Sequence, residues 1–340
     1  MSAKLEKQAA THASVLHNVK RQVFQSVPQL PSDISLVGKT ALVTGSNVGL
    51  GLECARYFLK LRPSRLVIAV RSIEKGETAA KSLRTEFPDA KIEVWQLDME
   101  SYRSVQAFAA RCEKELDRLH VAVLNAALAK IKLERVKDGR QREVTLQVNY
   151  LSTALLAILL LPIMKPTSYS PEPARLTIIT SDASLGEKLQ DPGQTSLLDS
   201  LDQPQRYDGF TQYARSKLLI TMFAARLAET VDPDDVIINS CNPGATKGTE
   251  FMREGSWVLK ALFALFFSLV GRTAVDAARI YVHAALVLGK ESHGSYTDWL
   301  VRAWPVMMYG EQNRKIQKKL WDETMKELSF AKVNEVLKKN

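Results

Sequence analysis

The chain of 340 residues is 46% hydrophobic and 24% charged, which is typical of a globular protein with a large core. Its formal net charge is +9, but the basic residues are scattered and no nucleic-acid-binding motif is present, so we expect no nucleic-acid partner. The three cysteines and five histidines lack the spacing of metal ligands, so the sequence predicts no metal site and a reducing compartment, the cytoplasm.

Residues 1–36 form the first segment. They are polar, contain few apolar positions and end in "VPQLPSD". We interpret them as a short amphipathic arm followed by a proline-punctuated linker. The first twenty residues contain no apolar run, so they do not resemble a secretory signal.

Residues 37–310 change in pattern, because short runs rich in Val, Ile and Leu alternate with longer helical stretches. Nearly continuous apolar runs are typical of strands that are buried on both faces. The alternation predicts an α/β domain: a single Rossmann-like, doubly wound parallel sheet with helices on both faces. A C-terminal helical tail follows at 311–340. The predicted strands are 39–45, 65–70, 91–98, 120–127, 174–181, 235–244 and 293–298. The predicted helices are 49–61, 73–86, 101–117, 141–161, 211–230, 272–289 and 312–337.

The stretch "TGSNVGLG" at 44–51 follows the first strand and opens a helix. Its glycines permit a tight turn and a close approach of the backbone to a pyrophosphate, and the helix start offers free N–H groups. The spacing T-G-x-x-x-G-x-G differs from the G-x-G-x-x-G fingerprint. The residues expected at the cofactor are Gly45, Ser46, Asn47, Val48, Gly49 and Leu50.

The second strand ends at "VIAVRS", which places Arg71 where an NAD-binding site commonly has an acid. A guanidinium can pair with a 2′-phosphate, so the sequence favours NADP(H) over NAD(H). The alternative is that Arg71 is simply an exposed residue at a strand end. Asp98 ends the third strand and could either reach the adenine amino group or cap the helix that begins near Ser101.

"QYARSK" at 212–217 places the Tyr213 phenol four residues before the Lys217 amine, on one face of a helix. Alone, this spacing is frequent by chance on any surface helix. The chemical alternative is that the ammonium lowers the phenol pKa, so that the phenol can exchange a proton nearer to neutral pH.

Taken together, these motifs resemble those of the short-chain dehydrogenase/reductase family, over about residues 40–250. The chain looks closest to the retinol-dehydrogenase-like branch and is also similar to fungal reductases that tailor secondary metabolites. The matching elements, in chain order, are "TGSNVGLG", Arg71, "LD" at 97–98, "NAA" at 125–127, "VNY" at 148–150, "TSDAS" at 180–184, "YARSK" at 213–217 and "NPGATKG" at 242–248.

The resemblance implies a catalytic group of Asn149, Ser181, Tyr213 and Lys217. Tyr213 would exchange a proton with the substrate oxygen while hydride moves to or from the nicotinamide. Lys217 would lower the phenol pKa and hold the nicotinamide ribose. Ser181 would orient the substrate oxygen, and Asn149 would hold a water that relays protons from Lys217 to solvent.

The resemblance also assigns the remaining cofactor contacts. Pro243 and Gly244 would pack under the nicotinamide, Thr246 would reach its carboxamide or a phosphate, and Asn125 would line the floor of the cleft. One departure from the family is Asp182, which follows Ser181 directly. Its carboxylate could raise nearby pKa values, select a polar substrate or point outward.

The function implied is hydride transfer between NADP(H) and a carbonyl or secondary alcohol of a bulky apolar substrate, as in a ketoreductase of secondary metabolism. We expect an insertion at 184–211 and an apolar segment at 249–270 to enclose the substrate, with Trp257, Phe263 and Phe267 on one wall. The apolar run 257–270 is too short to span a bilayer.

Alternatives remain open. They are a retinol- or steroid-type dehydrogenase at a membrane surface, a nucleotide-sugar epimerase or dehydratase, and a catalytically idle NADP-binding sensor or scaffold. The sequence also leaves open a homodimer through the helices at 101–117 and 141–161, which rests on fold analogy alone.

Overall fold

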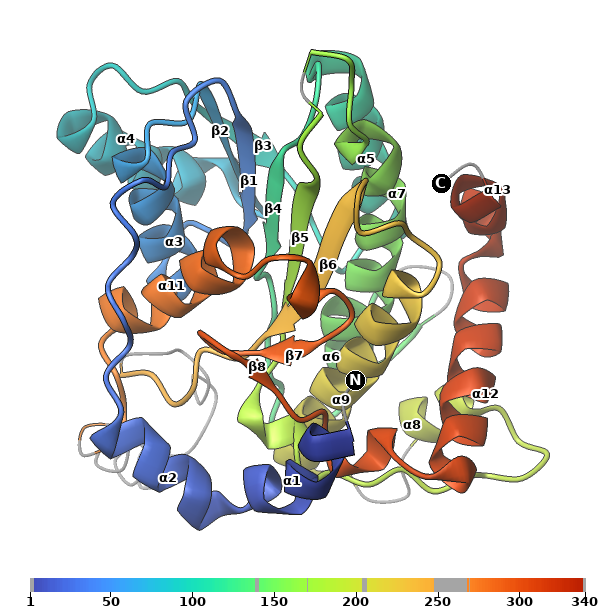
Figure 1. Ribbon diagram of the computed structural model, residues 1–340. Coiled ribbons are helices and arrows are strands. Elements are labelled where there is room, and N and C mark those ends of the chain that lie inside the picture. Colours follow the sequence, from blue (N-terminus) through green and yellow to red (C-terminus); the bar gives the residue numbers. More distant parts are fainter. Residues whose placement is uncertain are drawn as a thin grey trace.

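The computed structural model describes residues 3–137, 141–169, 171–203, 207–247, 268 and 270–338. Its centre is an eight-stranded sheet in the order β3-β2-β1-β4-β5-β6-β7-β8. Neighbouring strands are parallel except for the antiparallel pair β7–β8. This topology confirms the predicted doubly wound α/β fold (Figure 1). The strands are β1 (Thr40–Thr44), β2 (Arg65–Val70), β3 (Ile92–Gln96), β4 (Val121–Leu124), β5 (Ala174–Ile179), β6 (Val236–Cys241), β7 (Tyr296–Thr297) and β8 (Val301–Arg302).

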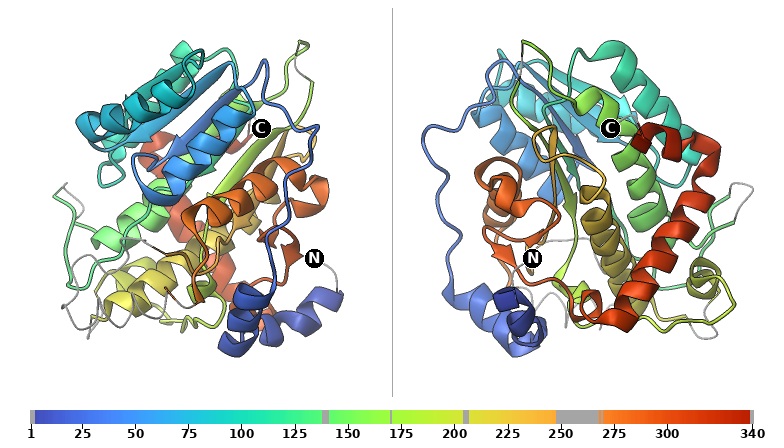
Figure 2. Two further views of the ribbon diagram at one scale, coloured as in Figure 1. Left: turned by 90° about the vertical axis from the view of Figure 1, so that its left-hand side faces the viewer. Right: turned by 45° about the vertical axis from the view of Figure 1, so that its right-hand side comes forward.

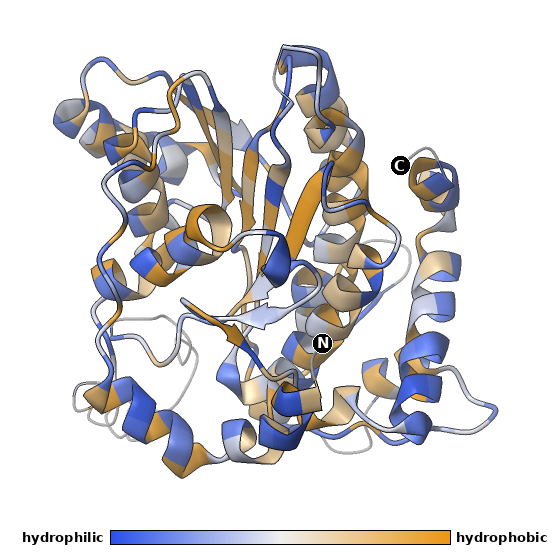
Figure 3. Cartoon of the chain, in the orientation of Figure 1, coloured by the Kyte–Doolittle hydropathy of each residue, from blue (hydrophilic) through white to orange (hydrophobic). Residues whose placement is uncertain are grey.

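The central strands are mostly apolar because each face of the sheet carries its own core (Figure 3). Successive side chains of a strand point to opposite faces. In β1, Leu42 belongs to one buried cluster, while Ala41 and Val43 belong to the other. The six main strands therefore appear in the sequence as nearly continuous apolar runs, which is why they could be predicted from it.

The helices divide between the two faces of the sheet (Figure 2). Residues of α3, α4 and α11 contribute to one cluster, and residues of α5, α7 and α9 contribute to the other. The helices are α3 (Gly49–Lys60), α4 (Ile73–Glu86), α5 (Tyr102–Glu115), α6 (Val144–Leu146), α7 (Thr153–Met164), α8 (Leu197–Asp202), α9 (Gly209–Ala228) and α11 (Ala274–Val282).

Two of the predicted helices contain a π-helical stretch. The helix predicted at 141–161 contains a π-helical stretch, Gln147–Ser152, between α6 and α7. The one predicted at 272–289 continues from α11 into a π-helical stretch, His283–Val287. Strand β8 was not predicted, because a two-residue strand leaves no detectable period in a sequence.

The N-terminal segment is packed on the domain. It forms α1 (Ala3–Ala13) and α2 (Val15–Phe24), and the chain then runs along the molecule to β1 (Figure 1). The predicted linker is anchored, since Val27 and Leu36 are buried and the Pro28 carbonyl lies 3.0 Å from Nε2 of His283.

The single helix predicted at 312–337 is divided into α12 (Glu311–Glu327) and α13 (Val333–Lys338), because Lys332 between them adopts a left-handed conformation with φ +54°. The apolar side chains of both helices join the larger core cluster. Within the described residues, one helical run, Val144–Met164, has the length and hydropathy to cross a membrane. Because 94% of its apolar window is buried inside the fold, it has the character of a core helix.

Candidate active site

The predicted site residues come together at the carboxyl ends of the central strands. Gly45 follows β1, Asn125 follows β4, Ser181 follows β5, and Asn242 follows β6. These strands are neighbours, and in open α/β sheets the crevice beyond such strand ends is the usual place for a ligand. Helix α9 adds Tyr213 to the same region through the hydrogen bond between the Ser181 and Tyr213 side chains.

The glycine turn has the geometry of a phosphate cradle. Gly45 has φ +65°, and a Cβ on Gly51 would lie 2.4 Å from the Gly45 carbonyl oxygen, so neither position has room for a larger residue. The Asn125 side-chain amide holds the turn in place by donating to the carbonyls of Thr44 (2.9 Å) and Gly45 (3.2 Å). The side chain before α3 is Val48, which makes no capping hydrogen bond, so the helix presents its first N–H groups without a side-chain cap. These residues fit a pyrophosphate.

The other predicted turn residues take different roles. The Ser46 hydroxyl is buried and donates to the Val43 carbonyl at 2.8 Å, so only its backbone can face a cofactor. Val48 is half exposed at the mouth of the turn. Asn47 and Leu50 flank it and are partly buried.

Arg71 stands at the end of β2, as predicted, but it has a partner. Its Nη1 donates to Oε1 of Glu100 at 2.6 Å, and the arginine side chain is 64% exposed. Exposed ion pairs of this kind contribute little to stability, so a phosphate could replace the Glu100 carboxylate as the partner of Arg71.

Asp98 accepts a hydrogen bond from the Glu100 N–H at 3.0 Å, within a turn. The helix cap is Ser101, whose hydroxyl accepts from the Ser104 N–H, so the alternative in which Asp98 caps this helix is wrong. The contact of Asp98 with the adenine amino group stays a prediction.

Burial dominates the protonation of the Tyr213–Lys217 pair. It raises the pKa of Tyr213 to about 12, while the hydrogen bond with Ser181 opposes the rise. It lowers the pKa of Lys217 to about 7. The Lys217 ammonium lies 5.7 Å from the centre of the phenol ring and donates to the Ile179 carbonyl at 2.9 Å. The predicted lowering of the phenol pKa by Lys217 is therefore not found in this structure.

Asn149 lies within the π-helical stretch that precedes α7. π-bulges are frequent at functional sites, and here the bulge directs the amide toward a neighbouring loop. Its Oδ1 accepts from the Leu128 N–H and its Nδ2 donates to the Leu128 carbonyl, both at 2.8 Å. The same Nδ2 donates to the Ser216 hydroxyl at 3.0 Å. Asn149 thus joins the loop after β4 to α9, and its role in a water relay stays a prediction.

Asp182 and Asn242 link the end of β5, where Ser181 lies, to the segment after β6 that is predicted to contact the nicotinamide. Asn242 Nδ2 donates to Asp182 Oδ1 at 2.5 Å, and the Asp182 N–H donates to Asn242 Oδ1 at 3.1 Å. The same Asn242 oxygen accepts from the Gly244 N–H at 3.1 Å. Asp182 does not point outward, and burial raises its pKa. Sequence reasoning singled out Asp182 as unusual but did not identify this partner, which depends on the pairing of β5 with β6.

Residues 244–246, which follow Asn242, are held by their own backbone and by Arg272. Gly244 adopts φ +73°, which favours glycine. The buried Thr246 hydroxyl donates to the Gly244 carbonyl at 3.2 Å, and Thr246 pairs in a parallel bridge with Arg272. Sequence reasoning missed Arg272.

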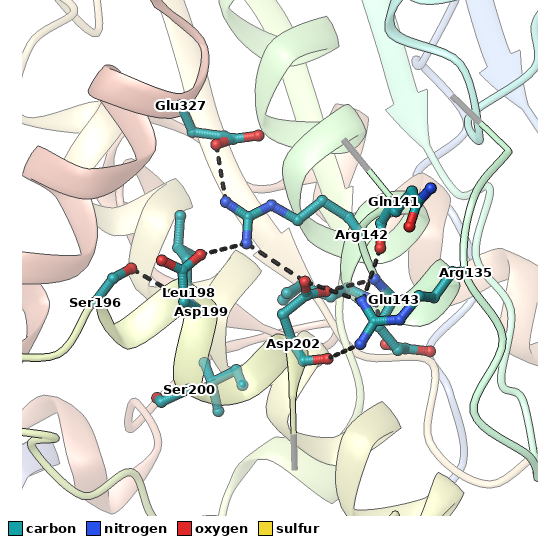
Figure 4. A network of polar contacts seen from close by, with 12 residues as sticks. Arg135, Gln141, Arg142, Glu143, Ser196, Leu198, Asp199, Ser200, Asp202 and Glu327 are labelled. Carbon is teal, nitrogen blue, oxygen red and sulfur yellow. Dashed lines mark hydrogen bonds and ion pairs between the residues drawn. The ribbon is translucent and has the colours of Figure 1, made fainter. Parts of the chain in front are cut away.

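The insertion at 184–211 is held by a polar network (Figure 4). Asp202 at the end of α8 accepts from the Glu143 N–H and pairs with Arg135 and Arg142. Arg142 also bonds Glu327 of α12 at 3.0 Å. The described part of the insertion is thereby tied to α12 and to the start of α6.

The same network reaches α9, the helix that carries Tyr213 and Lys217. The buried Glu143 carboxylate accepts from the N–H groups of Thr145 and Leu146 and from Nε2 of Gln212, each at 2.8–2.9 Å. Gln212 directly precedes Tyr213. Glu143 and Gln212 were not predicted, since neither carries a local motif.

Most of the predicted enclosing segment at 249–270, including Trp257, Phe263 and Phe267, lies outside the described residues. Across the part of the chain that the structure does describe, no group of three His, Cys, Asp or Glu side chains could hold a metal. The cysteines Cys54, Cys112 and Cys241 are free and buried.

Comparison with known proteins gives relatives over nearly the whole chain. The family model described as short chain dehydrogenase matches residues 39–192. The short chain dehydrogenase virL of Hypocrea virens is 43% identical over 343 residues, which cover 99% of this chain and 98% of the relative. The short chain dehydrogenase opdN of Penicillium oxalicum is 45% identical, with coverage of 87% and 97%.

Solved structures share the fold at low identity. The L-sorbose reductase of Gluconobacter frateurii, solved with NADPH and L-sorbose, is similar with a TM-score of 0.60 at 19% identity, covering 81% of this chain and 98% of that one. An NADPH-bound short chain oxidoreductase of Pseudomonas aeruginosa with an atypical catalytic center gives a TM-score of 0.59 at 21% identity, with coverage of 78% and 96%.

Proposed function

Because the chain belongs to the short-chain dehydrogenase/reductase family, we propose that it is an NADP(H)-dependent ketoreductase. The observation that carries the proposal is the contact between Ser181 and Tyr213 in front of the buried Lys217. A phenol whose pKa is raised to about 12 keeps its proton at neutral pH. At neutral pH Tyr213 therefore carries the proton that the reduction of a carbonyl requires, and Lys217 beside it has a pKa of about 7, near the working pH.

Each residue of the catalytic group has one task in reduction. NADPH, when bound, supplies the hydride that adds to the carbonyl carbon. The Ser181 hydroxyl orients the carbonyl oxygen, and the Tyr213 hydroxyl gives that oxygen its proton. Lys217, with its pKa lowered to about 7, can return a proton to the phenolate, and Asn149 holds the loop against α9.

The preference for NADP(H) is supported by Arg71 at the end of β2 and by the NADPH in related structures. The 2′-phosphate would replace Glu100 as the partner of Arg71. We expect Arg71→Ala to weaken NADPH about ten- to a hundredfold and to leave NADH unchanged. Equal affinities of the wild-type protein for both cofactors would contradict the proposal.

The substrate proposed is a bulky, largely apolar ketone of fungal secondary metabolism. The sequence resemblance to fungal tailoring reductases supports this class, and the relatives virL and opdN are fungal short chain dehydrogenases. We propose that residues 184–211 form one wall of the substrate site and that the enzyme works in the cytoplasm. The polar network around Asp202 favours a fixed wall here over a mobile lid.

The test is the loss of NADPH absorbance with a panel of ketones that differ in size and polarity. We expect bulky apolar ketones to be reduced and Tyr213→Phe to bind NADPH normally while losing turnover. Turnover by Tyr213→Phe at a near-normal rate would show that the proton donor is another group. Preference for small polar ketones would overturn the substrate class alone.

A further inference from the structure

Helix α2 lies against the segment predicted to support the nicotinamide. The Gln22 amide donates from Nε2 to the Ala245 carbonyl at 2.6 Å, across 223 positions of sequence. Gly244 is equally close, because a Cβ built on it would lie 2.4 Å from Oε1 of Gln22. The side chain of Gln22 thus covers the backbone of Gly244 and Ala245.

Arg272 closes this contact from the other side. Its backbone N–H donates to the Ala245 carbonyl, and its carbonyl accepts from the Lys247 N–H, both at 2.9 Å. Its guanidinium donates to Oε1 of Gln22 at 2.7 Å and to the Gln25 carbonyl, just beyond α2, at 3.0 Å. A cation at the carboxyl end of a helix is favourable, so Arg272 holds both α2 and the Ala245 segment.

An ion pair also fixes α2. Arg21 donates to Asp298 at 2.6 Å, and Arg302 donates to the same carboxylate oxygen at 2.8 Å. Asp298 is 6% exposed and Arg302 is 8% exposed, so water screens this pair poorly. The Arg21 and Arg272 guanidiniums also lie 4.9 and 5.0 Å from the centre of the Trp299 ring.

Little space remains between α2 and the strand ends. The cavity there is about 20 Å³, enough for about one water, and its lining includes Asn18, Asp182 and Asn242. Helix α2 therefore lies close to the Asp182–Asn242 pair.

We propose that α2 is part of the cofactor site and that Gln22 is a positioning residue for the nicotinamide half of NADP(H). The inference rests on the proposed function and on the role that the family resemblance implies for Pro243 and Gly244, the support of the nicotinamide. Gln22 sets the position of the Gly244–Ala245 backbone through the Ala245 carbonyl, and Arg272 sets the position of Gln22. The adenine half, held at the glycine turn and Arg71, is independent of this contact.

The experiment compares two ligands on the full chain. NADPH occupies both halves of the site, whereas adenosine 2′,5′-bisphosphate occupies only the adenine half. We expect Gln22→Ala to raise the Kd of NADPH about two- to tenfold, the range for one hydrogen bond, and to leave the Kd of the bisphosphate unchanged. Lys20→Ala, on the exposed side of the same helix, is the matched control and should change neither.

Gln22→Glu is the second variant. It keeps a partner for Arg272 but turns an acceptor toward the Ala245 carbonyl, so we expect it to weaken NADPH at least as much as Gln22→Ala. Unchanged NADPH affinity in both variants would overturn the inference, as would an equal loss for both ligands. Failure of the wild-type protein to bind NADPH would instead overturn the proposed function.

Discussion

Tyr213 and Lys217 share one face of α9, and burial moves their pKa values in opposite directions. The phenol rises to a pKa of about 12 and the ammonium falls to a pKa of about 7. At neutral pH Tyr213 is therefore protonated, whereas Lys217 changes its protonation state near this pH. This residue-scale arrangement gives the reaction a pH dependence with a definite sign.

We expect the rate of ketone reduction to fall as pH rises through about 7, because Lys217 then loses the proton that it returns to Tyr213. Oxidation of the product alcohol should show the opposite slope. The measurement is kcat/KM for the ketone between about pH 5.5 and 9, since this ratio reports the pKa values of the enzyme before the ketone binds. Lys217→Arg stays protonated throughout, so its profile should be flat even where its rate is lower. Identical profiles for both proteins would contradict the assignment.

The Asp182–Asn242 pair offers a test by exchange of partners. Asn242→Asp places a second carboxylate against Asp182, so we expect the Kd of NADPH to rise about tenfold or more. The double variant Asp182→Asn with Asn242→Asp restores one donor and one carboxylate and should recover most of the affinity. A double variant no better than the single one would show that the pair does not position the cofactor segment.

At the scale of elements, local pattern decided what could be predicted from the sequence. The six main strands are nearly continuous apolar runs, and Ser181, Tyr213 and Lys217 lie in short motifs whose order carries the family resemblance. The contacts that were missed join distant segments. Arg21 and Asp298 are 277 positions apart, and no local sequence pattern predicts such a pair.

The insertion shows the same dependence on distant elements. Helix α8 has its N-terminus capped by Glu323 of α12, whose carboxylate accepts from the Ser196 hydroxyl and from the N–H groups of Leu197 and Leu198, each at 2.9 Å. Six residues of helix would be marginal alone, so the cap and the α12 contact stabilise it.

We expect Glu323→Ala to lower the free energy of unfolding by about 1–3 kcal/mol, because three hydrogen bonds to one carboxylate are lost. Urea denaturation measures the change, and protease should then cut within 184–203 faster. Asp322→Ala, which removes only the exposed ion pair with Lys318, is the control and should cost less than about 0.5 kcal/mol. Equal denaturation midpoints for the two variants would mean that the cap contributes nothing.

For the whole molecule, the C-terminal helices α12 and α13 cover the apolar sides of α9 and α7. Trp321 of α12 stacks on Phe223 of α9 with ring centres 5.6 Å apart. The Tyr150 hydroxyl lies 2.5 Å from that of Thr324, and both residues are buried. Helix α13 packs on α7 as α5 does. The dimer considered from the sequence, through the helices at 101–117 and 141–161, would have to form beside this cover.

We therefore expect the full chain to be a monomer in solution, since α12 and α13 already bury the apolar sides of α7 and α9. Light scattering behind a sizing column gives the mass directly. Leu328→Ala, at a fully buried contact of the same cover, should lower the free energy of unfolding by about 2–5 kcal/mol. It should also promote association, because loosening the cover exposes apolar surface. Lys326→Ala is the exposed neighbour for comparison and should leave stability and mass unchanged. A wild-type dimer that persists unchanged in Leu328→Ala would show that the chain associates through another surface.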